Sequence, residues 1–145
     1  MIVEEANEVT SELVEAFGRL TGQLSRSAAP PGERELGHIV RSDSTRLLVA
    51  RVDGTIGGSL TLVLFRIPTG VRAIIEDVVV DGDLRGRGIG EALSREALEI
   101  AKDSGARTVD LTSRPSREAA NRLYQRIGFK LRETNVYRYS FDRRS

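Results

Sequence analysis

The fold is decided by one stretch of the chain, IEDVVVDGDLRGRGIG at residues 75–90. Its first part is rich in β-branched residues and completes a predicted strand over 71–81. Its second part carries glycine at three alternate positions, Gly86, Gly88 and Gly90. Apolar residues then recur at helical spacing over 88–104, and Gly105 is placed as the helix stop. The sequence therefore predicts a strand–turn–helix unit with the glycines in the turn.

The chemistry of this turn favours an anionic ligand. Glycines lack Cβ atoms, so their backbone N–H groups can approach a ligand closely. A helix N-terminus adds unpaired N–H groups and the positive end of the helix dipole. Arg85 and Arg87 add guanidinium donors suited to phosphate oxygens. These features predict a cradle for a pyrophosphate, although a tight turn with two exposed arginines is an alternative reading.

The positions of the glycines distinguish this turn from two common phosphate-binding loops. A Walker loop needs Gly-Lys-Ser/Thr, and no glycine of this stretch precedes a lysine. A dinucleotide fingerprint starting at Gly86 needs glycine at position 91, which is Glu91. The spacing does fit R-x-x-G-x-G, with Arg85, Gly88 and Gly90.

Hydropathy patterns outside this stretch predict the remaining elements. An Asp53-Gly54 turn between two β-rich runs indicates a hairpin. In chain order the patterns predict helices over 3–24 and 33–41, strands over 46–52, 55–66 and 71–81, a helix over 88–104, a strand over 109–112, a helix over 116–127 that begins at Ser116 as N-cap and ends before Gly128, and strands over 129–133 and 136–142.

The element order predicts the fold class. A strand–helix–strand passage favours a parallel pair with a right-handed crossover, whereas the preceding strands form an antiparallel meander. The prediction is an α/β (α+β) fold with a mixed, mostly antiparallel sheet of six to seven strands flanked by about four helices. A chain of 145 residues fits a single domain over 1–145.

Composition excludes several classes of site. Cysteine is absent, which removes thiol nucleophiles and cysteine metal sites. His38 is the only histidine, so neither a serine–histidine triad nor a histidine metal site is expected, and no metal is predicted. Aromatic residues make up 5% and the net charge is +1, which argues against nucleic-acid binding. No apolar run is long enough to cross a membrane, so a cytoplasmic location is expected.

A second motif identifies a family. Residues 121–129, NRLYQRIGF, resemble the signature N-x-x-Y-x-x-x-G-F, and the turn fits the coenzyme A motif R-x-x-G-x-G. Together they resemble the GNAT superfamily of acyl-CoA N-acyltransferases, and the predicted element order matches that fold. The resemblance implies acetyl-CoA as the acyl donor. It covers residues 46–139 well, whereas residues 1–45 match only as two helices that normally shape substrate choice.

The resemblance also implies roles for individual residues. Val78 and Val80, on either side of Val79, would bind the pantetheine arm through their backbone as if it were an added strand. Asn121 would touch the pantetheine or phosphate portion, and Tyr124 would lie near the thioester sulfur. At 100° per residue Tyr124 and Asn121 share one flank of their helix, away from an expected core face of Ala119, Leu123 and Ile127. The pyrophosphate would be held by amides of Arg85, Gly86, Arg87, Gly88, Ile89, Gly90 and Glu91.

The expected chemistry needs a base and an acid. Strand alternation places Glu76 and Asp77 on opposite faces, and Glu76 is the expected base, with burial needed to raise its ordinary pKa of ~4.3. A backbone N–H, that of Val78, would stabilise the oxyanion. Tyr124 would return a proton to the thiolate, helped if a nearby arginine lowers its pKa. Alternatively, the carboxylate on the strand pairs with an arginine or a loop amide, and Tyr124 packs at the edge of the sheet. In that case neither side chain takes part in the reaction.

The sequence thus predicts an N-acetyltransferase that moves an acetyl group from acetyl-CoA to a primary amine by direct attack in a ternary complex. The alternative is a non-catalytic acyl-CoA sensor or interaction module. The acceptor is a small-molecule or peptidyl amine, expected near the Pro30-Pro31 loop and the helix bearing His38. Arg114 and Arg117 would hold an anionic group of the acceptor or the 3′-phosphate of the cofactor. Alternatively, they are solvated surface residues. A homodimer is one alternative for the oligomeric state, since Leu98 lies opposite the apolar face of its helix.

Overall fold

The computed structural model describes residues 1–141 and divides into two compact units. The first unit runs from Met1 to Thr112 and the second begins at Ser113. Among the described residues no helix is long and apolar enough to cross a bilayer.

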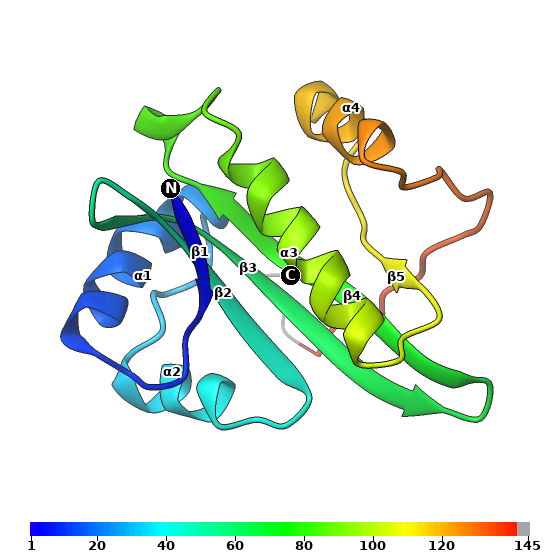
Figure 1. The fold of residues 1–145 in the computed structure, drawn as a ribbon, viewed down its shortest axis with the longest axis horizontal. Coiled ribbons are helices and arrows are strands. Elements are labelled where there is room, and N and C mark those ends of the chain that lie inside the picture. Colours follow the sequence, from blue (N-terminus) through cyan, green and yellow to red (C-terminus); the bar gives the residue numbers. More distant parts are fainter. Residues whose placement is uncertain (142–145) are drawn as a thin grey trace. The chain divides into compact units, whose positions relative to one another are not determined.

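The first unit is built on one five-stranded sheet (Figure 1). Its strands lie in chain order, each beside the next, and every neighbouring pair is antiparallel except the last, β4 with β5, which is parallel. The mixed, mostly antiparallel sheet is confirmed, but the prediction of six to seven strands was too high. The strands are β1 (Ile2–Glu5), β2 (Thr45–Val52), β3 (Thr55–Ile67), β4 (Gly70–Val80) and β5 (Val109–Asp110).

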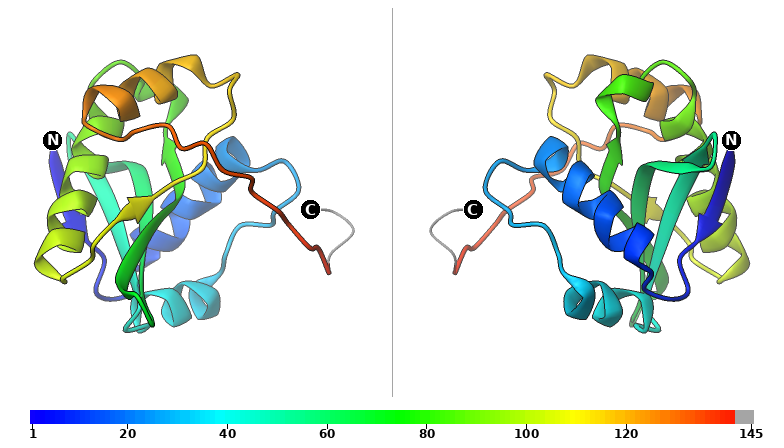
Figure 2. Two further views of the ribbon diagram at one scale, coloured as in Figure 1. Left: turned by 90° about the vertical axis from the view of Figure 1, so that its right-hand side faces the viewer. Right: turned by 90° about the vertical axis from the view of Figure 1, so that its left-hand side faces the viewer.

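Three helices cover the two faces of this sheet (Figure 2). Helices α1 (Ser11–Leu24) and α2 (Glu33–Val40) lie on one face, where their apolar side chains form a core with side chains of β2, β3 and β4. Helix α3 (Ile89–Asp103) lies on the other face and buries Ile89, Leu93 and Ala97. The predicted helices over 33–41 and 88–104 are confirmed within one or two residues.

The N-terminus differs from the prediction of one helix over 3–24. Residues Ile2–Glu5 form β1, which pairs with β2, and the helix begins only at Ser11. The Thr10 hydroxyl accepts a hydrogen bond from the Leu13 amide at 3.1 Å and caps the helix there. The apolar residues before Thr10 recur at steps that fit a helix, but the sheet edge on β2 and the threonine cap decide the structure.

Over residues 113–141 the second unit contains one helix, α4 (Glu118–Arg126), within the predicted range 116–127. Its N-cap is Arg117 and not the expected Ser116, and no side chain caps it. Through residue 141 the predicted strands over 129–133 and 136–142 do not form, and Asp142 lies outside the described residues. A β-rich pattern reports side-chain preference, whereas a strand also needs a neighbouring backbone to pair with.

Candidate active site

The glycine turn joins the end of β4 to the start of α3. A short 3₁₀ turn, η1 (Gly82–Leu84), leaves the strand, and the chain then passes through Gly86 and Gly88 with φ of 82° and 77°. These left-handed conformations suit glycine and strain other residues. Apart from the adjacent residues, no described residue has an atom within 4 Å of where a Cβ would stand at either glycine. The turn therefore presents bare backbone to open space.

The backbone amides in the first turn of α3 have no carbonyl partner within the helix. The first helical bond at this end runs from the Ala92 amide to the Gly88 carbonyl at 3.0 Å. The amides of Ile89 and Gly90 precede it, and they lie at the positive end of the helix dipole. Arg85 and Arg87 are exposed beside them. This arrangement of donors and positive charge fits the predicted pyrophosphate cradle.

Two glycines that the sequence analysis missed seat this turn on the sheet. A Cβ at Gly58 would stand 2.9 Å from Ile89 and 3.1 Å from the Val79 carbonyl, and one at Gly57 would overlap Leu84. The Gly57-Gly58 pair inside β3 thus lets the turn and the start of α3 approach the sheet closely. Adjacent glycines within a strand were the available signal, because such glycines mark a close backbone approach.

Strand β4 carries a bulge where the predicted thioester site lies. Thr61 of β3 pairs with Glu76, and Ser59 pairs with Val79, so one residue of β3 faces two of β4. Asp77, one of those two, has φ of 49°, which is unusual for a residue other than glycine. Strand β4 therefore has a bulge at Asp77 and Val78, which strand alternation in the sequence does not reveal.

Among residues 1–141, the second half of β4 pairs with no strand on the side where β5 lies. Strand β5 pairs only with Ala73 and Ile74, so it leaves β4 before the bulge. The Asp81 amide donates to the Gly57 carbonyl on the β3 side at 2.8 Å. Alternation along extended backbone then directs the N–H and C=O groups of Val80 to the opposite edge, and Val78 lies next to this stretch, in the bulge. An extended amide-bearing arm can add to this edge.

Glu76 lies on the face of the sheet that α1 and α2 cover. It pairs with Thr61, which in turn pairs with Leu47, a member of the core under these helices. Glu76 is exposed, so the burial expected to tune it is not present in this structure. The bulge also interrupts the simple alternation from which opposite faces were predicted for Glu76 and Asp77.

In the second unit, Tyr124 is buried and does not lie on a flank as predicted. It is 7% exposed, whereas Leu123 and Ile127 of the expected core face are only half-buried. Its ring meets Phe129 edge to face, with centroids 5.8 Å apart. Burial raises the pKa of the Tyr124 hydroxyl above its ordinary value of 10.0, and the Arg117 charge opposes this more weakly. An arginine therefore does act to lower this pKa, as the sequence suggested, but burial outweighs it and the net shift of the Tyr124 pKa is upward.

Asn121 has a local structural bond. Its side-chain amide donates to the Arg114 and Arg117 carbonyls, both at 2.9 Å, and so closes the turn before α4. Asn121, Tyr124 and the two arginines lie in the second unit, whereas Glu76, Val78 to Val80 and the glycine turn lie in the first. The structure therefore shows the predicted site as two groups, one in each unit.

A separate hollow lies in the first unit, away from the glycine turn. It has a volume of about 350 Å³ and is lined by the turn before α1 and both ends of α2, with Glu8, Glu33 and Arg41 among its charged residues. None of the predicted site residues lines it. Among residues 1–141 no group of three or more carboxylate or histidine side chains gathers as a metal site would.

Comparison with known proteins decides the family. The model of the acetyltransferase (GNAT) family matches residues 8–129. The chain belongs to the GNAT family. This match includes the glycine turn, the bulged strand and the second signature, which confirms the family predicted from the two motifs. By fold and by homology this GNAT protein is an acyltransferase.

Three relatives of this GNAT protein show how far the similarity extends. A glucosamine 6-phosphate N-acetyltransferase from Trypanosoma brucei brucei is 34% identical over 142 residues, covering 92% of this chain and 90% of that protein. An uncharacterized N-acetyltransferase from Methanocaldococcus jannaschii is 44% identical over 61 residues, which are 42% of this chain and only 27% of that protein. The structure of an aminoglycoside N-acetyltransferase in complex with CoA has a TM-score of 0.79 at 17% identity, covering 97% and 95% of the two chains.

Proposed function

We propose that this GNAT protein transfers an acetyl group from acetyl-CoA to a primary amine by direct attack in a ternary complex. The observation that carries the proposal is the pairing of two features within the first unit. The glycine turn offers open backbone and positive charge, and within the described part of the chain no strand pairs with the adjacent edge of β4 from the bulge to Val80. A ligand that joins a pyrophosphate to an extended diamide arm matches both.

The cofactor roles follow from these features. Backbone groups of Val78 and Val80 would pair with the pantetheine amides, while the buried Val79 side chain fixes the strand in the core. Amides from Arg85 to Glu91 would hold the pyrophosphate, together with the exposed Arg85 and Arg87 guanidinium groups. Asn121 would contact the cofactor through its side-chain oxygen, because its nitrogen is engaged with the turn before α4.

The proposed reaction uses three further groups of the chain. Glu76 takes the proton of the attacking amine, directly or through water, which suits its exposure. The Val78 amide stabilises the oxyanion beside the bulge. The Tyr124 hydroxyl protonates the departing thiolate. Its raised pKa keeps that hydroxyl protonated at neutral pH, so the proton-donating form predominates there.

For the acceptor we propose an amino sugar, with glucosamine 6-phosphate as the first compound to test. The support is the trypanosomal relative, which is similar over nearly the full length of both chains and is named for that acceptor. The chain carries an excess of six positive charges beyond residue 15, from 22 basic and 16 acidic residues. That excess suits a phosphorylated acceptor as well as an anionic donor.

For the assembly we propose a homodimer. Large apolar side chains are exposed in the segment after α4, and contiguous exposed apolar surface is typical of protein contacts. They are Leu131, Val136, Tyr137, Tyr139 and Phe141. Sedimentation at micromolar concentration should give twice the chain mass of 15.9 kDa, and a monomer mass would reject the dimer.

Cofactor binding is tested by thermal unfolding. Acetyl-CoA at 100 times its dissociation constant should stabilise the folded state by about 2.7 kcal/mol. For a domain of this size the Tm then rises by roughly 5–10 °C. ATP and NAD serve as controls, since each carries phosphates but neither has a pantetheine arm for the β4 edge. An unchanged Tm with millimolar acetyl-CoA, or an equal shift with ATP, would contradict the proposed cofactor.

A further inference from the structure

Helix α1 is bonded to the segment that leads from β4 into the glycine turn. The Arg19 Nη1 donates to Asp81 Oδ2 at 3.1 Å, and the Gln23 side-chain oxygen accepts a hydrogen bond from the Gly82 amide at 2.8 Å. Arg19 and Gln23 lie four residues apart and therefore one turn apart on the same face of α1. Two successive residues of the connecting segment are thus held by two successive turns of one helix.

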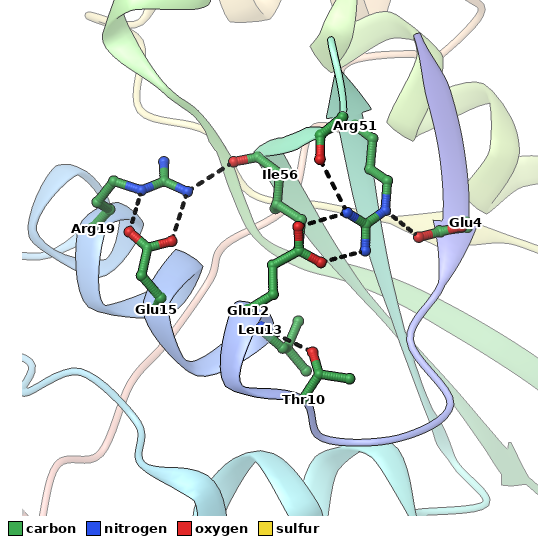
Figure 3. Close-up of polar contacts among 9 residues, drawn as sticks. Glu4, Thr10, Glu12, Leu13, Glu15, Arg19, Arg51 and Ile56 are labelled. Atoms are coloured by element: carbon green, nitrogen blue, oxygen red, sulfur yellow. Dashed lines mark hydrogen bonds and ion pairs between the residues drawn. The ribbon is translucent and has the colours of Figure 1, made fainter.

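Arg19 is itself fixed in place. Its guanidinium forms an ion pair with Glu15 at 2.8 Å and donates to the Ile56 carbonyl at 3.1 Å (Figure 3). Its pKa is raised chiefly by the hydrogen bond to Glu15, with a smaller contribution from Asp81. The Asp81 side chain is only 17% exposed, so its interaction with Arg19 is partly shielded from water. This arrangement is rigid compared with a surface ion pair.

The bonds continue from this anchor into the turn. The other carboxylate oxygen of Asp81 accepts from the Asp83 amide at 3.1 Å, and the Asp81 carbonyl accepts from the Leu84 amide at 2.9 Å. Leu84 packs over Gly57, one residue before the turn begins at Arg85. The backbone that leads to Arg85 is therefore tied to Asp81, whose amide is held by the Gly57 carbonyl and whose carboxylate is held by Arg19.

We infer that Arg19 and Gln23 are positioning residues for the cofactor turn: they hold Asp81 and Gly82 so that the amides after Arg85 converge on the pyrophosphate. This inference rests on the proposed function of the turn. Neither side chain needs to touch the cofactor. The helix that resembles the acceptor-selecting part of the family thereby also sets the geometry of the donor site.

The test uses Arg19→Met and Gln23→Met, which keep the aliphatic stems and remove the bonds. A net hydrogen bond of ordinary strength corresponds to roughly a 2- to 10-fold change, so each variant should weaken CoA binding by about that factor. Turnover of acetyl-pantetheine, which lacks the pyrophosphate, should keep its KM. Arg19→Lys, which retains one donor for Asp81, should recover part of the lost affinity.

The matched control is Arg51→Met. Arg51 of β2 also bridges α1 to the sheet, with Glu12 at 2.7 Å and Glu4 at 2.6 Å, but its partner Glu12 lies in the first turn of the helix, away from Arg19 and Gln23 (Figure 3). It should lower Tm without changing the affinity for CoA. An equal loss of affinity in Arg51→Met would show a general effect of α1 stability and would overturn the inference.

Amide hydrogen exchange gives a readout that needs no cofactor. Exchange at residues 83–90 should accelerate in Arg19→Met and Gln23→Met and stay unchanged in Arg51→Met. Unchanged exchange in both variants would overturn the positioning role, as would faster exchange with unaltered CoA affinity. Absence of CoA binding by the parent protein would instead refute the proposed function, while the exchange data would still decide whether α1 holds the turn.

Discussion

Gly88→Val is expected to abolish CoA binding. The valine side chain would occupy the open space beside the backbone at the N-terminus of α3, where the pyrophosphate is proposed to lie. Loss of the phosphate contacts should raise the Kd at least 100-fold, which corresponds to about 2.8 kcal/mol. Calorimetric titration with CoA measures the effect directly.

Backbone strain has to be separated from this loss, because Gly88 has φ of 77°. A β-branched residue in that conformation costs on the order of 1–3 kcal/mol of stability. Gly105→Val provides the matched control, since Gly105 follows the other end of α3 with φ of 83° and equally open surroundings. Similar losses of Tm with loss of CoA affinity only in Gly88→Val would confirm the cradle. Normal affinity in Gly88→Val would reduce the turn to a structural element.

Tyr124→Phe is expected to lower kcat by roughly 10²- to 10⁴-fold, the usual contribution of a general acid. The variant removes one hydroxyl and keeps the ring that packs on Phe129, so Tm and CoA affinity should change little. Because the interaction forms only in the transition state, kcat and kcat/KM should fall together. An acyl donor with a more acidic thiol should narrow the difference from the parent protein.

The pH dependence follows from the raised pKa of Tyr124. A general acid works while protonated, so activity is retained below its pKa and lost above it, and burial moves that loss to pH above 10. The alkaline limb of kcat should therefore lie above pH 10 and disappear in Tyr124→Phe. Glu76→Gln should lower kcat without removing that limb. Unchanged turnover of Tyr124→Phe where chemistry limits the rate would exclude Tyr124 as the acid.

Much of the first unit could be predicted because local patterns and pairing partners agree there. The Asp53-Gly54 hairpin, the strand before the glycine turn and α3 each have a turn or stop signal at the expected place. The N-terminal strand was missed because its apolar spacing also fits a helix, and only the Thr10 cap and pairing with β2 separate the two.

The sequence predicted which residues belong to the candidate site better than it predicted how they are arranged. Motif spacing located the turn, but it carries no information about the bulge at Asp77, which depends on how β4 pairs with β3. A helical wheel likewise misplaced Tyr124, because burial depends on tertiary packing and not on periodicity alone. Arg19 and Gln23 had no signal in the sequence, since their partners lie 62 and 59 residues away.

The most direct test of the account is amine-dependent release of CoA thiol from acetyl-CoA. Purified protein is incubated with acetyl-CoA and, separately, glucosamine 6-phosphate, an aminoglycoside or a peptide with a free N-terminal amine. The account predicts thiol release with at least one amine, matched mole for mole by the N-acetylated product in mass spectrometry and absent in Gly88→Val. Binding of acetyl-CoA without amine-dependent release for any of these acceptor classes would contradict it and would favour an acyl-CoA sensor.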